Sequence, residues 1–242
     1  MRQADNAVQA ATHPQSGGKF LLGRHAIIAI GIVLLPFAVN SIHAMPASDD
    51  FCYAAQVDKV GYIDAIHHYY NTVNGRFFAT TLIVTLNALF PISQAYSGVP
   101  LVLLGMLFLA AIALFRAATP RAVDWPTVTI LGMMFSAILV ANAGALSEVI
   151  YWLSGGATYL SVTAFTLLTL ACMLALARHH SRNRSYLALT GAGALFAAAA
   201  VGSMEASGPV LIASAFAGAF AVHLTGRSGC LGLCLIGIGA AI

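Results

Sequence analysis

The sequence predicts an all-α protein, a polytopic transmembrane helix bundle of 7–8 membrane segments with an amphipathic surface helix in its first outer loop. The first observation is composition. Of 242 residues, 60% are hydrophobic and only 8% are charged, which is more apolar surface than a soluble domain can bury. The second is that the apolar residues form separate runs of about the length that crosses a bilayer. The runs lie at 25–44, 77–92, 99–115, 127–146, 157–177, 186–202, 208–225 and 229–242.

The chain before the first run is polar, and residues 1–19 are expected to be a disordered cytoplasmic tail. The first run is long for the apolar core of a signal peptide, so it is interpreted as a retained span, with a signal peptide as the alternative. Residues 20–242 are expected to form one transmembrane module. Because the sequence ends at Ile242 inside an apolar run, this module is expected to be the N-terminal part of a longer protein.

The second run, 77–92, is short, contains three threonines and Asn87, and ends near Pro91. It is expected to lie in the outer interface or to re-enter the membrane rather than to span it. In that arrangement, nine of eleven basic residues face the cytoplasm and six of eight acidic residues face the outside, as the positive-inside rule predicts. If 77–92 spans fully, the arginines of 116–121 and 178–184 fall outside, and this arrangement is the alternative.

The first outer loop, 45–76, contains an amphipathic segment at 56–73. Its apolar residues recur at three- and four-residue steps, with charged residues between them. The apolar residues are Val60, Ile63, Ile66, Tyr70 and Val73. This pattern is typical of a helix that lies on a membrane surface.

The same loop contains two adjacent carboxylates, Asp49 and Asp50, just after the first span. Because two ionised carboxylates so close repel each other, one is expected to share a proton, hold a cation or pair with an arginine. Such a pair suits a general base, or oxygen ligands for a divalent cation such as Mg or Mn. The alternative is a helix cap with a solvated turn.

The tripeptide Asn74-Gly75-Arg76 ends the loop. Arg76 lies on the predicted outer side, against the usual charge bias, and a guanidinium fork fits the oxygens of a lipid-linked phosphate. The alternative is that its side chain reaches toward lipid headgroups.

Two later loops contain further candidates. At 147–159 an acid and three aromatic residues surround two glycines, a combination found in sugar-binding sites, and an aromatic belt at the membrane interface is the alternative. The residues are Glu148, Tyr151, Trp152 and Tyr159. Glu205 lies between two apolar runs, where a solvated loop acid is the alternative.

Four short motifs carry a resemblance to a known family. They are Asp-Asp-Phe-Cys-Tyr-Ala at 49–54, Asn-Gly-Arg-Phe at 74–77, Glu-x-x-Tyr-Trp-x-x-Gly-x-x-x-Tyr at 148–159, and Met-Glu-Ala-Ser-Gly at 204–208. With these motifs the chain resembles the GT-C superfamily of polytopic membrane glycosyltransferases. Over roughly 20–210 it is similar to bacterial uncharacterised membrane proteins allied to O-antigen glucosyltransferases.

The resemblance implies an inverting glycosyltransferase at the outer, periplasmic or extracellular, face of the bacterial cytoplasmic (inner) membrane. Its implied partners are the lipid bilayer, a polyprenyl-phosphate sugar donor and a glycan or lipid acceptor, with a divalent cation as a candidate cofactor. Asp49 is the implied base, and Asp50 its partner or a metal ligand. Substrate-binding roles are implied for Tyr53, Asn74, Arg76, Glu148, Tyr151, Trp152, Tyr159 and Glu205. Such families usually have longer chains and a full second span at 77–92.

Two other functional classes stay open: a transporter or flippase of a lipid-linked sugar, and a non-catalytic membrane subunit. A transporter is expected to carry acids in mid-span, whereas the candidate acids here lie at the ends of spans. The sequence has no basic stripe or aromatic platform that would indicate nucleic-acid binding.

Overall fold

The computed structural model describes residues 16–90, 92–178, 184–224 and 230–241, and over these residues the fold is all-α, which confirms the predicted class. The helices are α2 (Ser16–Ile42), α3 (Asp49–Val60), α4 (Tyr62–Tyr69), α5 (Phe77–Leu89), α6 (Ile92–Ala118), α7 (Trp125–Ala141), α8 (Leu153–Ala177), α9 (Arg184–Ser203), α10 (Ser207–Leu224) and α11 (Cys230–Gly239). There are also two π-helical turns: η1 (Tyr70–Asn74) lies between α4 and α5, and η2 (Ser147–Tyr151) lies between α7 and α8. The predicted tail, 1–19, lies mostly outside the described residues, and its end belongs to α2.

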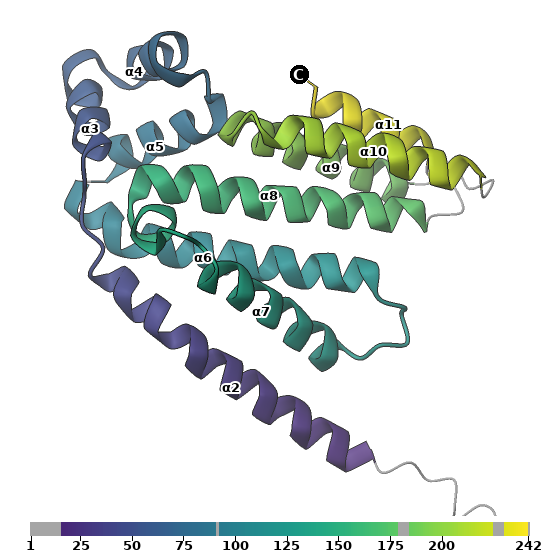
Figure 1. The fold of residues 1–242 in the computed structure, drawn as a ribbon. Helices are drawn as coiled ribbons and strands as arrows, with labels where there is room; N and C mark the ends of the chain where they lie inside the picture. The colour runs from purple at the N-terminus through teal and green to yellow at the C-terminus, as the bar shows by residue number, and fades with distance from the viewer. Residues whose placement is uncertain (1–15, 91, 179–183, 225–229, 242) are drawn as a thin grey trace, which may run out of the picture.

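The helices pack around α8, which runs through the middle of the molecule (Figure 1). α6 packs along one side of α8 and α9 along the other. α7 and α2 lie beyond α6, while α10 and α11 pack with α9. The short helices α3, α4 and α5 gather at the end of the bundle where α8 begins (Figure 1). The first predicted outer loop is therefore next to the start of α8.

Hydroxyl side chains are tolerated within the apolar helix α8 because they bond to its own backbone. Thr158 and Ser161 each donate to the carbonyl four residues earlier. The hydroxyl oxygens of Ser161 and Ser203 on α9 lie 3.1 Å apart, a polar contact between the two helices. Farther along, Gly232 of α11 approaches α9 closely enough for its N–H to donate to the Tyr186 hydroxyl at 2.6 Å.

Four helices of the described chain are long and apolar enough to cross a membrane. Their spanning segments are Gly98–Ala118, Leu153–Ala177, Arg184–Ser203 and Ser207–Leu224. The other apolar helices are shorter, so the total of 7–8 membrane segments stays a prediction. α5 has only 13 residues and is ~20 Å long, below the ~30 Å of a bilayer core. Its length agrees with a segment that does not span the membrane by itself.

The prediction of one continuous helix over 56–73 is wrong. The helix is interrupted at Gly61, where φ is +85°, so that α3 ends before this residue and α4 begins after it. A residue with a Cβ adopts this conformation only at a cost, so the glycine permits the bend between α3 and α4. After the bend, α4 buries Ala65 and Tyr69 against α5. It leaves Ile63 exposed, as expected for an apolar surface next to lipid.

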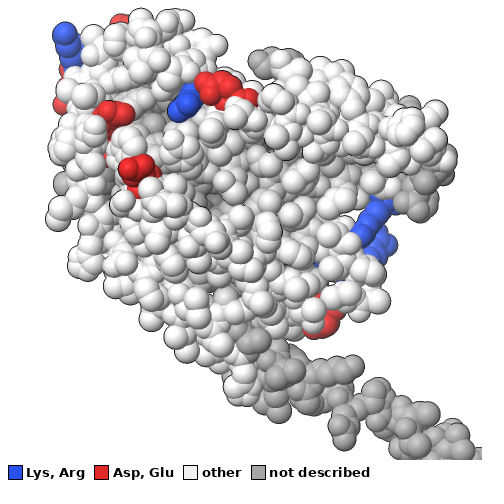
Figure 2. All heavy atoms as spheres, in the orientation of Figure 1, with Lys and Arg blue, Asp and Glu red and all other residues white. Residues whose placement is uncertain are grey.

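Charged side chains gather at the two ends of the bundle, with a broad uncharged surface between them (Figure 2). Along α8 the ends are marked by Ser154, beside the candidate acids, and by Arg178, which follows the last turn. A helix of 25 residues is ~37 Å long, slightly more than a bilayer core. This distribution suits helices that cross a membrane.

Candidate functional site

Asp50 is fully buried at the start of α3, and its carboxylate joins α3 to the start of α8. Its Oδ1 accepts hydrogen bonds from the Ser154 N–H at 3.0 Å and from the Ser154 hydroxyl at 2.6 Å. Its Oδ2 accepts from the Ala47 N–H at 3.1 Å. A buried carboxylate needs such donors because removing it from water is costly. Asp50 is therefore an anchor that determines where the neighbouring Asp49 lies.

The start of α8 can approach η2 closely because residues 155 and 156 are glycines. A Cβ on Gly155 would lie 1.8 Å from the Glu148 carbonyl oxygen, a distance that no side chain tolerates. A Cβ on Gly156 would lie 3.3 Å from the Ile150 carbonyl oxygen. The two glycines thus allow the turn that places Ser154 next to α3.

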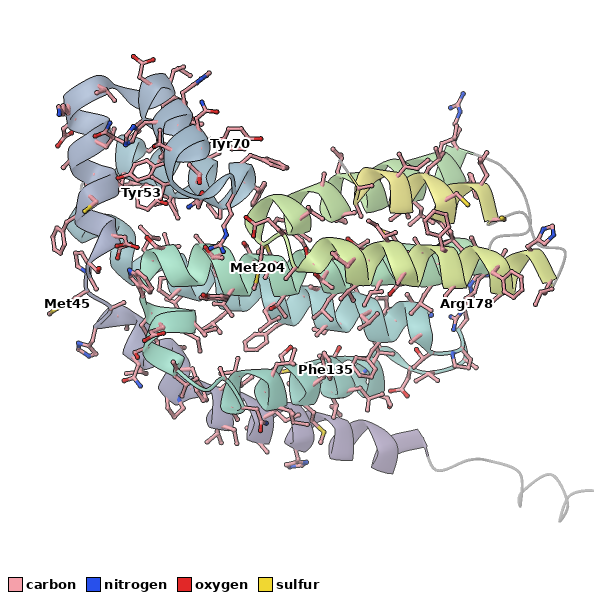
Figure 3. All side chains as sticks on the ribbon, turned by 45° about the horizontal axis from the view of Figure 1, so that its top comes forward. Met45, Tyr53, Tyr70, Phe135, Arg178 and Met204 are labelled. Carbon is pink, nitrogen blue, oxygen red and sulfur yellow. The ribbon has the colours of Figure 1, made fainter. Side chains whose placement is uncertain are left out.

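Asp49, unlike Asp50, is exposed and lines a cleft of about 90 Å³ between α3, α5 and the start of α8. The Ser48 hydroxyl donates to its Oδ1 at 3.2 Å. The residues predicted from the sequence that line this cleft are Asp49, Tyr53, Asn74, Arg76, Trp152 and Tyr159. Figure 3 shows Tyr53 at this end of the bundle and Arg178 at the other. The structure therefore brings most of the predicted site residues to one surface.

Asn74 connects three elements around the cleft. Its Oδ1 accepts from the Arg76 N–H at 3.0 Å and from the Thr80 hydroxyl at 3.2 Å. Its Nδ2 donates to the Tyr53 hydroxyl at 3.4 Å. Gly75 follows in the left-handed conformation, with φ +63°, which turns the chain from η1 into α5. These contacts position Arg76 next to α3.

Arg76 forms an ion pair with Glu205, which lies between α9 and α10. Its Nε lies 3.4 Å from Glu205 Oε2, and the two side chains are 33% and 59% exposed. Pairs open to water contribute only ~0–1 kcal/mol to stability. Because the pair is weak, Glu205 leaves the guanidinium group able to bind another anion at the cleft.

Two stacked tyrosines support the cleft from α3 and α4. The ring centres of Tyr53 and Tyr69 lie 4.0 Å apart. Burial raises the pKa of the Tyr53 hydroxyl. Burial and the neighbouring Tyr53 raise the pKa of Tyr69 to about 12. Both phenols keep their protons at neutral pH, so the Tyr53 hydroxyl can donate a hydrogen bond to a ligand in the cleft.

The aromatic residues next to η2 also hold the chain that leads into α3. Trp152 Nε1 donates to the Ala47 carbonyl at 3.1 Å, and the Tyr151 hydroxyl donates to the Phe37 carbonyl of α2 at 3.3 Å. Trp152 also contributes to the cleft wall. Tyr151 and the exposed Glu148 are not among the described residues that line the cleft. Asp50 and Glu205 do not line it either, although each bonds to a residue that does, Ser154 and Arg76 respectively.

Three hydroxyl residues of the cleft were not predicted as site residues: Thr80, Ser154 and Thr158. In the sequence each is a Ser or Thr next to or within an apolar run, and such residues are also common where membrane helices pack. Thr80 contacts Asn74 and Ser154 contacts Asp50, while Thr158 bonds to the Ser154 carbonyl, and these contacts identify the three residues only once the fold is known.

The two carboxylates are not arranged as one cation site. Asp49 faces the cleft, whereas both oxygens of Asp50 already accept hydrogen bonds from N–H or O–H groups. Among the described residues, no three His, Cys, Asp or Glu side chains come close enough to hold a metal ion.

The cleft thus combines an exposed carboxylate, an arginine and tyrosine and threonine hydroxyl groups at one end of the bundle. Comparison of the chain with protein-family models, with curated proteins and with solved structures gave no match.

Proposed function

We propose that this protein is a membrane glycosyltransferase that moves a sugar from a polyprenyl-phosphate donor to a glycan or lipid acceptor. The observation that carries the proposal is that Asp49 and Arg76, a base and a phosphate-binding cation, line the same cleft. The nearby helix α4 exposes Ile63, an apolar side chain that suits contact with the membrane from which a lipid-linked donor arrives.

The reaction that fits these groups is a single displacement with inversion at the sugar. The acceptor hydroxyl oxygen attacks C1 of the sugar, and the bond between C1 and the phosphate oxygen breaks. That oxygen keeps the electron pair on the departing polyprenyl phosphate, while Asp49 takes the proton of the hydroxyl group. Arg76 stabilises the negative charge of the phosphate. Asp50 holds the start of α3 in place and does not contact the substrate.

The size of the cleft determines how much of the donor it can enclose. Its volume of about 90 Å³ is below the ~300–1,000 Å³ of typical ligand pockets. It suits a phosphate group, with the sugar outside. Tyr159 is 39% exposed and Trp152 is partly exposed, so both offer ring surface for a sugar at the rim. We therefore place the phosphate at Arg76 and the sugar against these rings.

The positions of the acids favour an enzyme over a transporter. The four helices long enough to span contain no Asp or Glu. A transporter that couples ions or carries polar substrates commonly places such residues near mid-membrane. Asp49 and Glu205 instead lie at or beyond helix ends, where chemistry at a membrane surface takes place.

Arg76→Lys is expected to weaken donor binding roughly 10- to 100-fold, because a point charge cannot reproduce a guanidinium fork and charged hydrogen bonds contribute ~1.5–3 kcal/mol each. The measurement is equilibrium binding of a fluorescent polyprenyl-phosphate sugar to the protein in nanodiscs. Glu205→Gln is the matched control. It removes the competing carboxylate, so donor affinity should hold or rise. Parental affinity in Arg76→Lys would show that this arginine contacts lipid headgroups instead.

We also propose that the cleft faces the outside of a bacterial cytoplasmic membrane and that the arginine-rich end faces the cytoplasm. Ser147 in η2 and Ala122 between α6 and α7 are exposed at opposite ends and suit a labelling test. In a background with the exposed Cys52 replaced by serine, an impermeant thiol reagent added to intact cells should modify Ser147→Cys and spare Ala122→Cys. The reverse labelling pattern would invert the proposed orientation.

A further inference from the structure

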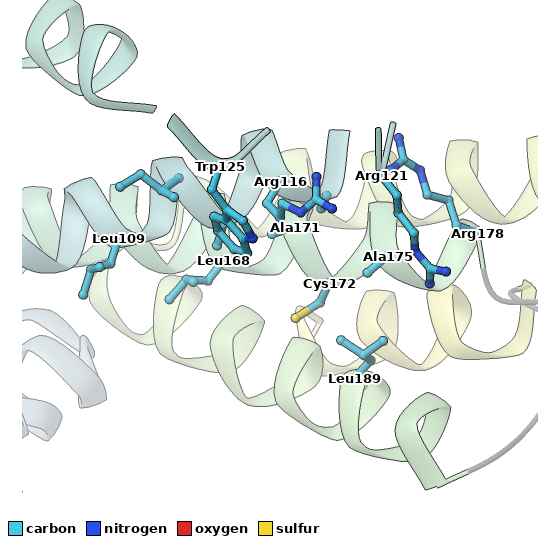
Figure 4. A pocket seen from close by; sticks show the side chains of 13 residues that line it. Leu109, Arg116, Arg121, Trp125, Leu168, Ala171, Cys172, Ala175, Arg178 and Leu189 are labelled. Atoms are coloured by element: carbon cyan, nitrogen blue, oxygen red, sulfur yellow. The ribbon is translucent and has the colours of Figure 1, made fainter. Parts of the chain in front are cut away.

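A second, larger cavity lies at the end of the bundle opposite the cleft. It is a groove of about 790 Å³ lined by α6, α8, α9 and residues around the α6–α7 loop. Figure 4 shows arginine side chains and a tryptophan along this groove together with small and aliphatic side chains. The apolar lining includes Leu109, Ile112, Leu168, Ala171, Ala175 and Leu189. The polar lining is Arg116, Arg121, Arg178 and Trp125.

The fold holds Arg116 at the groove through backbone carbonyls and an aromatic ring. Its Nη1 donates to the carbonyls of Pro120 and Val123, both at 3.4 Å. Its guanidinium carbon lies 5.3 Å from the centre of the Trp125 ring, a cation–π contact. These partners are neutral, so none of them neutralises the positive charge of Arg116.

The other two arginines likewise form no ion pair within the described residues. Arg178 donates to the carbonyls of Ala118 and Thr119. Arg121 is exposed and has no hydrogen-bond partner within the described residues. No described carboxylate lies within ion-pair distance of any of the three. Asp124 lies in the same loop and accepts hydrogen bonds from the N–H and hydroxyl of Thr127. The groove thus has three arginines near one acid, and an apolar groove with this excess of positive charge matches a ligand that is both anionic and apolar.

We propose that this groove binds an anionic membrane phospholipid, with its phosphate on the arginines and an acyl chain along the apolar wall. Guanidinium groups form charged, often bidentate, hydrogen bonds with phosphate oxygens. A zwitterionic lipid would bring its own cation next to three arginines, and a free phosphate would leave the apolar wall uncovered. This inference is independent of the proposed transferase activity, because the groove and the cleft share no lining residue and their nearest lining residues on α8, Tyr159 and Leu168, lie ~14 Å apart along the helix.

The fluorescence of Trp125 can report directly whether a lipid occupies the groove. Trp125 lines the groove, is 62% exposed and is one of two tryptophans in the chain. The full chain with Trp152→Phe is placed in phosphatidylcholine vesicles that contain a small fraction of dibrominated lipid, whose bromine quenches nearby tryptophan. Dibrominated phosphatidylglycerol should quench Trp125 at a several-fold lower mole fraction than dibrominated phosphatidylcholine.

Arg121→Gln is the most informative variant because it removes charge without removing a contact within the described protein. It should reduce the preference for phosphatidylglycerol about fivefold, the effect of one basic residue at an anionic surface. Arg184→Gln is the matched control, since Arg184 is exposed at the start of α9 but does not line the groove. This variant should keep the parental preference.

Two outcomes would overturn the proposal. Equal quenching by the two brominated lipids would show that the groove does not select an anionic headgroup. Reversal of the phosphatidylglycerol quenching by millimolar inorganic phosphate would show that a free anion, rather than a lipid, occupies it. If Trp152→Phe does not fold, lipid retained by the unchanged chain from mixed micelles with equal amounts of both lipids gives the same comparison by mass spectrometry.

Discussion

Asp49→Asn is expected to lower the rate of sugar transfer about 10²–10⁴-fold and to leave the fold intact. The amide has nearly the same size as the carboxylate but cannot take the proton of the acceptor hydroxyl. Asp49 is exposed, and within the described residues its carboxylate accepts from the Ser48 hydroxyl, a bond that an amide oxygen can also accept. The measurement is transfer of labelled sugar from a polyprenyl-phosphate donor in reconstituted vesicles, with thermal unfolding measured in parallel.

Asp58→Asn is the control for this experiment. Asp58 lies on the same helix, is exposed and does not line the cleft. The Asp58→Asn substitution removes the same charge from the same end of the molecule. It therefore measures any general electrostatic effect of charge loss on donor binding. Transfer by Asp49→Asn at the rate of Asp58→Asn would remove the base from the proposed mechanism and with it the enzymatic role of the cleft.

Asp50→Asn is expected to lower the free energy of unfolding by about 2–3 kcal/mol. The amide offers one acceptor oxygen, which can still face the two donors of Ser154. Its NH₂ group then faces the Ala47 N–H, so two donors oppose each other at a fully buried position. The measurement is unfolding in detergent, followed by helix content. Transfer activity should fall with the folded fraction because Asp50 positions α3.

Two other variants are compared with Asp50→Asn for their effect on the free energy of unfolding. Ser154→Ala removes one donor to Asp50 but keeps the backbone N–H, so the loss should be about 1 kcal/mol. Asp49→Asn should leave the free energy of unfolding unchanged. If Asp50→Asn is as stable as the parent and still loses transfer, Asp50 acts on the substrate directly and its assignment as an anchor is wrong.

Much of the fold and part of the site could be predicted from composition and periodicity. Apolar runs of about the length that crosses a bilayer predict helices, because backbone N–H and C=O groups in lipid must form their hydrogen bonds within the helix. The predicted site residues Asp49, Tyr53, Asn74 and Arg76 all come from one short loop, 45–76, and the structure places all four on the cleft. Their proximity depends on the bend at Gly61, which folds α4 back so that Tyr69 stacks on Tyr53 of α3.

Other features depend on residues distant in sequence. Arg76 meets Glu205, 129 residues later, and Asp50 meets Ser154, 104 residues later. No local pattern indicates either partner. Glu148 and Tyr151 were predicted as site residues because aromatic residues lie near an acid in the sequence, yet neither is among the described residues that line the cleft. The arginine groove likewise forms only where three separate helices meet.

The sequence by itself determined that this chain is a bundle of apolar helices with a pair of aspartates just after the first. It did not determine which aspartate would be buried. Adjacent residues on a helix point about 100° apart, so one can face the protein while the other faces water. The choice depends on where α8 docks, and α8 brings the two Ser154 donors to Asp50. Only the tertiary structure decided that Asp50 supports the fold and Asp49 faces the cleft.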